Sequence, residues 1–212
     1  MRLAPLLIAL FLAAVASPAY AQLPRKIPPV VFDIRGFYSP LGQDPTTARD
    51  LDVTANELPR RGLGGAVGLH VYPLRKQNIA LGIGGEGVLV WGHAQQEDQM
   101  GHPVGDPVQQ RIRGLAGQLS LNFGHKAGWS YVSAGMGPMS FATYQGETAP
   151  VDPAPVKMTI DLGSGARWFF KPHVAFTFDL RFYLTRPEEI TGAYPGRQRH
   201  RLAVWSAGIS FQ

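Results

Sequence analysis

Apolar residues alternate with polar or small residues along most of the chain after residue 29. A period of two is typical of β-strands with one apolar face, whereas an amphipathic helix repeats about every 3.6 residues. Clusters of Gly, Pro, Asp and Asn separate the alternating stretches. The pattern predicts eight strands and no helix after Gln22, and the alternation is weakest in the fifth strand. The predicted strands span residues 30–39, 62–72, 79–92, 110–123, 129–144, 157–170, 174–184 and 201–211.

The connections between these strands alternate between short and long. Tight turns are expected at residues 73–78, 124–128 and 171–173, and long polar loops at residues 40–61, 93–109, 145–156 and 185–200. This alternation predicts an all-β, antiparallel up-and-down meander. Closed into an eight-stranded transmembrane β-barrel, it would place the four long loops outside the cell, and the three tight turns and both chain ends on the periplasmic side.

The composition of the two strand faces distinguishes a membrane barrel from a water-soluble one. One face consists mainly of Leu, Ile, Val, Phe and Trp, and the other mainly of Gly, Ala and Ser with isolated charges. A soluble barrel would carry Lys, Glu and Thr on its outer face. We therefore expect the apolar face to meet lipid and the small-residue face to fill the narrow lumen that eight strands enclose. The alternative is a secreted β-sandwich with a core of these apolar residues.

Aromatic residues gather near the ends of the predicted strands, as in the girdles that mark the two membrane–water boundaries. Tyr38, Tyr72 and Phe123 are assigned to this apolar face. The aromatic girdle and C-terminal strand are further predicted to include Trp91, Trp129, Trp168, Phe170, Trp205 and Phe211.

The first residues have the features of a secretory signal peptide. Met1 and Arg2 precede an apolar run at residues 3–16, which is too short to span a bilayer as a helix, and Ala19-Tyr20-Ala21 has the small-x-small pattern of a cleavage site. We expect a signal peptide at 1–21 cleaved after Ala21, a flexible lead-in at 22–29 and a barrel domain at 30–212.

The amino-acid composition excludes several classes of protein. The chain has no cysteine, only 17% charged residues, 25 Gly and 18 Pro. These values exclude a disulfide scaffold, a coiled coil, a disordered acidic tail and a cytosolic enzyme. The net charge of +5 falls to +4 when Arg2 is removed with the signal peptide.

The run at residues 162–173, continuing to 179–183, resembles the penultimate hairpin of small bacterial outer-membrane barrels of the eight-stranded OmpA, OmpX and OmpW-like group. The signal peptide, the strand layout and the aromatic-ended last strand also match, over nearly the whole mature chain. The resemblance implies a cell outer-membrane location, contact with the lipid bilayer, and recognition by the barrel-assembly machinery through the C-terminal strand. The chain departs from the pattern because Gln212 follows Phe211. A monomer is expected.

The pairing of the predicted strands at 157–170 and 174–184 brings opposite charges close together on the lumen face. If residues 171–173 form a three-residue turn, Phe170 faces Val174, and the residues diagonal to one another on the lumen face are Arg167 with Asp179 and Asp161 with Arg181. Diagonal partners lie ~7–8 Å apart at the backbone, within reach of an Arg side chain.

Other strands carry further charges on the same face. We predict a lumen ion-pair network that plugs the barrel, formed by Asp33, Arg35, Glu86, Asp161, Arg167, Asp179 and Arg181.

Other motifs give weaker indications of chemistry. The glycine spacing at 82–87 fits a dinucleotide fingerprint, but that motif needs a helix after it, and residues 88–91 continue a strand. His93 and His102 share a loop with Asp98 and Asp106, and His200 lies in another loop, but no rigid ligand spacing marks a metal site. His70 faces the lumen, where a structural hydrogen bond is expected. No cofactor and no metal is predicted.

Lipid-modifying enzymes and nucleic-acid-binding proteins each have a sequence pattern that can be looked for here. Some small barrels are lipid deacylases with a His-x-Ser pattern, and no His-x-Ser occurs in this chain. The basic turns form no stripe interleaved with aromatics, so no nucleic-acid partner is expected. The predicted function is a non-catalytic scaffold that displays extracellular loops, whose ligand the sequence does not name. The alternatives are a small-solute pore and a lipid-modifying enzyme.

Overall fold

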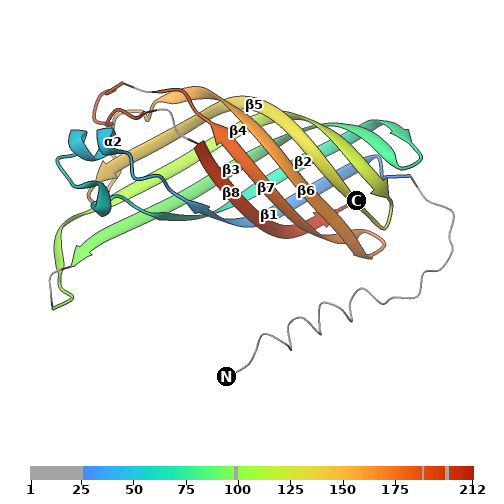
Figure 1. Ribbon diagram of the computed structural model, residues 1–212, viewed down its shortest axis with the longest axis horizontal. Helices are drawn as coiled ribbons and strands as arrows, with labels where there is room; N and C mark the ends of the chain where they lie inside the picture. The colour runs from blue at the N-terminus through green and yellow to red at the C-terminus, as the bar shows by residue number, and fades with distance from the viewer. Residues whose placement is uncertain (1–25, 98–99, 188, 199–200) are drawn as a thin grey trace.

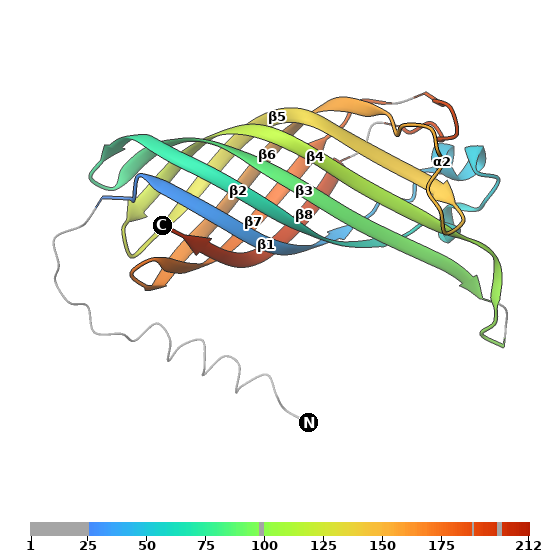
Figure 2. The same cartoon turned by 180° about the vertical axis from the view of Figure 1, so that it is seen from behind.

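The computed structural model describes residues 26–97, 100–187, 189–198 and 201–212; the predicted signal peptide and its cleavage site lie outside these ranges. Eight antiparallel strands close into one barrel in sequence order, as Figures 1 and 2 show from opposite sides. The predicted fold class is therefore confirmed. The strands are β1 Val30–Pro40, β2 Arg61–Lys76, β3 Ile79–Glu97, β4 Pro103–His125, β5 Gly128–Gln145, β6 Val156–Lys171, β7 Val174–Leu184 and β8 Arg201–Phe211.

The strands are staggered around the ring. A path of paired residues can be followed once around the ring, from Arg113 in β4 through β3, β2, β1, β8, β7, β6 and β5. It returns to β4 at Phe123, ten residues from where it began. Such a stagger requires the strands to tilt, typically by ~35–45° from the axis of a closed barrel. The tilt is visible in Figure 1.

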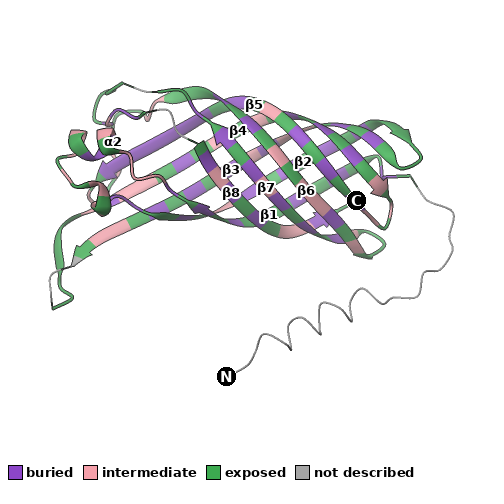
Figure 3. Ribbon diagram, in the orientation of Figure 1, coloured by how far each residue is buried: buried purple, intermediate pink, exposed green. Residues whose placement is uncertain are grey.

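Burial alternates along most of each strand, and large apolar residues cover the outside. Figure 3 shows the resulting stripes of buried and exposed residues across the wall. Ile34, Val67, Leu119 and Phe178 are half exposed on the outer face, while the neighbouring inward residues are buried. The expected assignment of the two faces is confirmed in the middle of the barrel, where large apolar residues lie outside and charged and polar residues lie inside.

The two ends of the barrel differ. Two-residue turns at Gln77-Asn78, Lys126-Ala127 and Pro172-His173 join strands at one end, where the C-terminus also lies (Figures 1 and 2). We call this the turn end and the opposite one the loop end. Among the described residues no helix is long and apolar enough to cross a membrane.

Two expectations about the loop end were wrong. The first long loop contains the short helix α2 (Pro45–Asp50) and the 3-10 turn η1 (Ala55–Glu57), although no helix was predicted. Asp44 caps α2 through the backbone N–H of Thr46, and Pro45 stands in its first turn; six residues are too few for a helical period to be detected. The second predicted loop is largely a hairpin, because β3 extends to Glu97 and β4 begins at Pro103 (Figure 1).

The register of the β6–β7 hairpin matches the prediction except beside its turn. Trp168 pairs with Phe176 and Gly165 with Asp179, which is the register that Phe170 opposite Val174 would continue, but Lys171 rather than Phe170 pairs with Val174. An irregularity between Phe169 and Lys171 absorbs one extra residue and shortens the turn to two residues.

Candidate functional site

The barrel interior is the candidate site, and a charged network occupies its middle. On one side Arg167 of β6 reaches across the lumen to Asp33 of β1: its Nη2 donates to Oδ2 at 2.6 Å and its Nε to Oδ1 at 3.1 Å. The Ser210 hydroxyl also donates to Asp33, and His70 Nδ1 lies 3.6 Å from Asp33 Oδ2. Both charged side chains are almost completely buried.

On the other side Arg181 of β7 serves three carboxylates. Its Nη1 lies 2.5 Å from Asp161 Oδ1, its Nη2 lies 3.1 Å from Asp179 Oδ2, and its Nε lies 3.3 Å from Glu86 Oε1. Because a guanidinium carries a planar fork of donors, one arginine can pair with carboxylates from β3, β6 and β7 at once.

Arg35 of β1 joins the network through two acidic residues. It pairs with Glu86 through Nη2 and lies 3.1 Å from Asp179 Oδ1 through Nη1. The structure thus brings all seven predicted lumen residues together. Three guanidiniums face four carboxylates, and every one of these side chains is at least 98% buried.

Neutral side chains satisfy further atoms of these carboxylates. The Tyr131 hydroxyl donates to Asp179 at 2.6 Å, and the Tyr183 hydroxyl donates to Glu86 at 2.9 Å. The Gln118 amide donates to Asp161 at 3.2 Å, and its oxygen forms a hydrogen bond with Nε2 of His70. His70 therefore makes the structural hydrogen bond expected of it. A buried charge is tolerated when it is paired and hydrogen-bonded in this way.

One predicted pair was wrong. Asp161 does pair with Arg181, but Arg167 pairs with Asp33 instead of Asp179. The diagonal rule considers one hairpin, whereas in a closed barrel of eight strands a long side chain reaches the opposite wall. Arg167 also lies over the Tyr131 ring, 4.4 Å from its centroid, and the hydroxyl of that tyrosine is hydrogen-bonded to Asp179.

Glycines on the inner face make room for this network. A Cβ at Gly165 would lie 2.5 Å from the Tyr131 hydroxyl, and one at Gly84 would lie 2.3 Å from the His70 ring. The run at 82–87, which has the spacing of a nucleotide fingerprint, is therefore part of strand β3 and leaves space for bulky neighbours.

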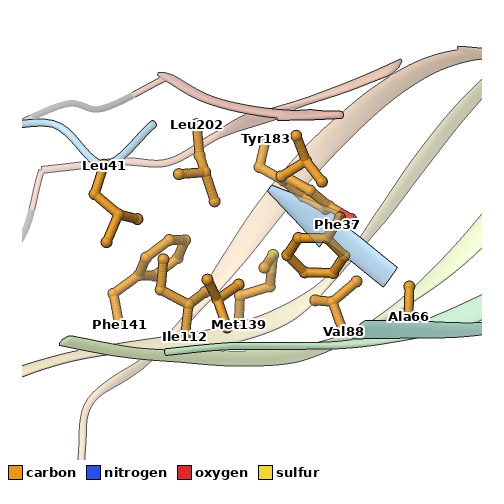
Figure 4. Close-up of a cluster of buried hydrophobic side chains, with 11 residues drawn as sticks. Phe37, Leu41, Ala66, Val88, Ile112, Met139, Phe141, Tyr183 and Leu202 are labelled. Atoms are coloured by element: carbon orange, nitrogen blue, oxygen red, sulfur yellow. The ribbon is translucent and has the colours of Figure 1, made fainter. Parts of the chain in front are cut away.

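An apolar cluster fills the interior above the network, toward the loop end. Figure 4 shows its side chains converging from opposite walls. Its members are Phe37, Leu41, Ala66, Val88, Val90, Ile112, Met139, Phe141, Tyr183, Leu202 and Val204. The sequence prediction missed this cluster. The signal was the loss of alternation at residues 88–91, where consecutive apolar residues supply both faces of β3.

An aromatic cluster fills the interior below the network, toward the turn end. The Tyr72 and Trp129 rings meet edge to face at 6.2 Å, and Trp129 stacks on Phe169 at 5.2 Å. Trp129 and Tyr72 were expected on the lipid face, and this was wrong because both are buried inside. Trp129 shares the inward face of β5 with Tyr131, and Tyr72 shares that of β2 with His70.

The other predicted girdle residues face outward. On the outer wall, about half of each side chain is exposed in Trp91, Trp168, Phe170, Trp205 and Phe211. Several pack against neighbouring aromatics: Phe170 on Phe176, Trp168 on Phe178 and Phe211 on Phe32.

The first and fourth loops meet over the mouth of the barrel. The Thr47 hydroxyl donates to the carbonyl of Gly196 at 2.9 Å, and the Gly196 N–H donates to Asp50 at 3.0 Å. Asp44, the cap of α2, also accepts from the N–H of Gln198 at 2.7 Å. Between them the buried Arg197 lies over the Phe141 ring, 4.6 Å from its centroid.

Loop residues also cover part of the outside of β5. From Met139 to Tyr144 both faces of this strand are buried, because Ala149, Ala154 and Tyr194 pack on Ala142 and Tyr144. This cover explains why the fifth strand alternates weakly in the sequence.

Among the described residues no group of three or more His, Asp or Glu side chains is arranged to hold a metal ion. Asp98 and His200, which were considered as metal ligands, lie outside the described ranges.

Comparison with solved structures identifies the fold. The chain is similar to Neisserial surface protein A (NspA), with 9% identity, a TM-score of 0.51, and coverage of 86% of this chain and 95% of that one. It is also similar to the outer membrane protein OprG from Pseudomonas aeruginosa, with 8% identity, a TM-score of 0.50, and coverage of 89% and 97%. No protein-family model matches the chain, and no curated protein matches its sequence. The chain therefore has the fold of the small eight-stranded barrels, which is the architecture that the resemblance in its sequence implied.

Proposed function

We propose that the protein is a non-catalytic barrel of the bacterial outer membrane that anchors and displays its loops and whose interior is sealed. The observation that carries this proposal is the division of the wall into an apolar outer face and an interior filled along its length. The likeness in fold to an outer membrane protein, OprG, supports the location.

The apolar outer face argues for lipid as its surroundings. Large apolar side chains are exposed on the outside of all eight strands, from 36% at Leu184 to 67% at Leu63, which water would disfavour over so large an area. A closed ring pairs every strand with two neighbours and leaves no unpaired edge, the condition for backbone to cross a bilayer as strands.

Three layers support a sealed interior. The aromatic cluster, the charged network and the apolar cluster follow one another from the turn end to the loop end, and the first and fourth loops meet above them. A small-solute pore would need a continuous polar path, and the apolar layer argues against one. The His-x-Ser pattern of small-barrel deacylases does not occur in the sequence, and His70 inside the barrel is engaged with Gln118 and Asp33.

Conductance and lipid analysis test the proposal together. The refolded chain, inserted into planar lipid bilayers in KCl, should give no steps above the lipid baseline, whereas a porin measured in the same cell should. Lipid extracts of expressing cells should show the same mass distribution as extracts of cells that carry an empty vector. Regular conductance steps would replace the sealed scaffold by a pore, and a new lipid species would replace it by an enzyme.

A further inference from the structure

The outer wall carries two arginines where its apolar belt ends. On β4 the outward positions from Phe123 to Leu115 carry apolar residues or glycine, and the next two outward positions are Arg113 and Arg111. Arg113 pairs with Leu89 of β3 and with Ser140 of β5. Arg113 and Phe123 are ten residues apart on β4, at ~3.3 Å per residue in a strand tilted by ~40°. Arg113 therefore lies about 25 Å above Phe123 along the barrel axis, which is the usual height of the apolar band. Arg113 therefore stands at the level of the lipid headgroups on the loop side.

Charges at this level of the outer wall have one sign. Arg61 and Arg201 stand at the loop ends of β2 and β8 and are exposed, like Arg111 and Arg113. Glu86 of the neighbouring strand β3 points into the barrel, where it pairs with Arg35. Among the described residues no carboxylate lies within salt-bridge distance of Arg113 or Arg111, in contrast to the paired arginines inside. This edge is complementary to anions.

A groove of about 650 Å³ runs along the outer surface beside Arg113. Its floor includes Gly65 and Gly87, which present no side chain, and its walls include Trp91 and Leu115. A Cβ at Gly65 would meet no atom closer than the Arg35 carbonyl at 3.4 Å, an ordinary contact. Packing within the wall therefore does not require glycine at position 65. Because Gly65 has no side chain, the groove stays open to the membrane.

We propose that this groove binds one acyl chain of a phosphorylated lipid of the outer leaflet, with the lipid phosphate against Arg113 and Arg111. A guanidinium fork matches the geometry of a phosphate, and the apolar groove below it lies in the direction in which an acyl chain would run. Arg111 is already held over the Tyr144 ring, 5.7 Å from its centroid. A second copy of the chain fits the surface less well, because a symmetric contact would bring the same basic edge together.

Native mass spectrometry of the full chain refolded in detergent tests this site, with lipid A as the phosphorylated probe and phosphatidylcholine as the zwitterionic one. The wild type should retain one lipid A at least about tenfold better than phosphatidylcholine, since the phosphate adds charge-assisted contacts. Arg113→Gln should lower the retained fraction of lipid A at least about fivefold. Gly65→Leu should lower it similarly by filling the groove while leaving the arginines in place. A heated and unheated gel identifies the folded fraction of each variant.

Arg201→Gln is the matched control, because Arg201 is also exposed at the loop end but does not line the groove. It should retain lipid A as the wild type does. Equal losses in Arg113→Gln and Arg201→Gln would overturn the site in favour of diffuse charge attraction. Equal retention of both lipids, an unchanged Gly65→Leu variant, or dimers in place of lipid adducts would overturn it as well. None of these outcomes bears on whether the interior is sealed.

Discussion

At the scale of single residues, the buried charges depend on partners from distant parts of the chain. Asp33 and Arg167 are 134 positions apart, yet two hydrogen bonds join them inside the barrel. The sequence placed both on the inward face, because parity along a strand depends only on local alternation. It did not predict their pairing, which depends on how far a side chain reaches across a closed lumen.

A double-mutant cycle on Asp33→Asn and Arg167→Met should show strong coupling. Each single variant leaves a buried charge without its partner, which typically costs ~3–5 kcal/mol, so the double variant should be less destabilised than the sum of the two. Urea titration of the refolded chain measures the free energies of unfolding. The matched cycle, Asp161→Asn with Arg167→Met, should be close to additive, since Asp161 pairs with Arg181. Equal coupling in both cycles would contradict the arrangement.

Alanine substitutions at an inward and an outward glycine should have different effects on stability. Gly165→Ala should destabilise the barrel by about 1–3 kcal/mol, because its Cβ would lie 2.5 Å from the Tyr131 hydroxyl and would disturb the bond to Asp179. Gly117→Ala should be neutral or slightly stabilising, because its Cβ would meet nothing closer than 4.0 Å. The same urea titration applies, and a Gly117 variant as unstable as the Gly165 variant would argue against the assigned faces.

At the scale of elements, strands were predictable where one face is small or polar and the other apolar. The limits of β7 and β8 agree with the sequence pattern to the residue. The pattern was least informative where the barrel carries apolar residues on both faces, in β5 beneath the loops and in β3 beside the apolar cluster. Helix α2 was not predictable, because a capped turn of six residues has no period to detect.

The outward face of β7 gives a direct test of its contact with lipid. Phe178→Arg should reduce folding into lipid vesicles strongly, because a charge near the bilayer midplane costs ~2–4 kcal/mol, and Phe178 is half exposed within the apolar wall. Glu147→Arg, an exposed loop substitution with the same new side chain, should fold as the wild type does. Folded yield is read from the gel shift between heated and unheated samples. Equal yields of the two variants would place Phe178 outside the bilayer.

At the scale of the whole molecule, β8 closes the ring by pairing with both β7 and β1. Phe211 near its end stacks on Phe32 of β1 with a centroid distance of 6.4 Å, so the two rings share one contact. Only Phe211 belongs to the C-terminal strand through which we expect the assembly machinery to recognise the chain. Comparing substitutions of Phe211 and Phe32 therefore distinguishes recognition by the assembly machinery from the loss of the ring contact.

Phe211→Ala should lower the amount of folded protein in the outer membrane more than it lowers refolding into detergent. Phe32→Ala removes the same ring contact and should affect refolding to a similar extent, with a smaller loss in cells. Quantitative immunoblots of membrane fractions and refolding yields provide the two measurements. Similar cellular yields of the two variants would show that the terminal aromatic has no separate role in assembly, even with Gln212 after it.

Fractionation of cells that express the full chain, followed by electrophoresis of unheated and heated samples, tests the central claim most directly. A closed barrel with an apolar outer face should be found in the outer-membrane fraction and should migrate differently before and after heating, because the folded ring resists detergent until it is heated. A band in the soluble fraction whose mobility does not change on heating would contradict the membrane barrel.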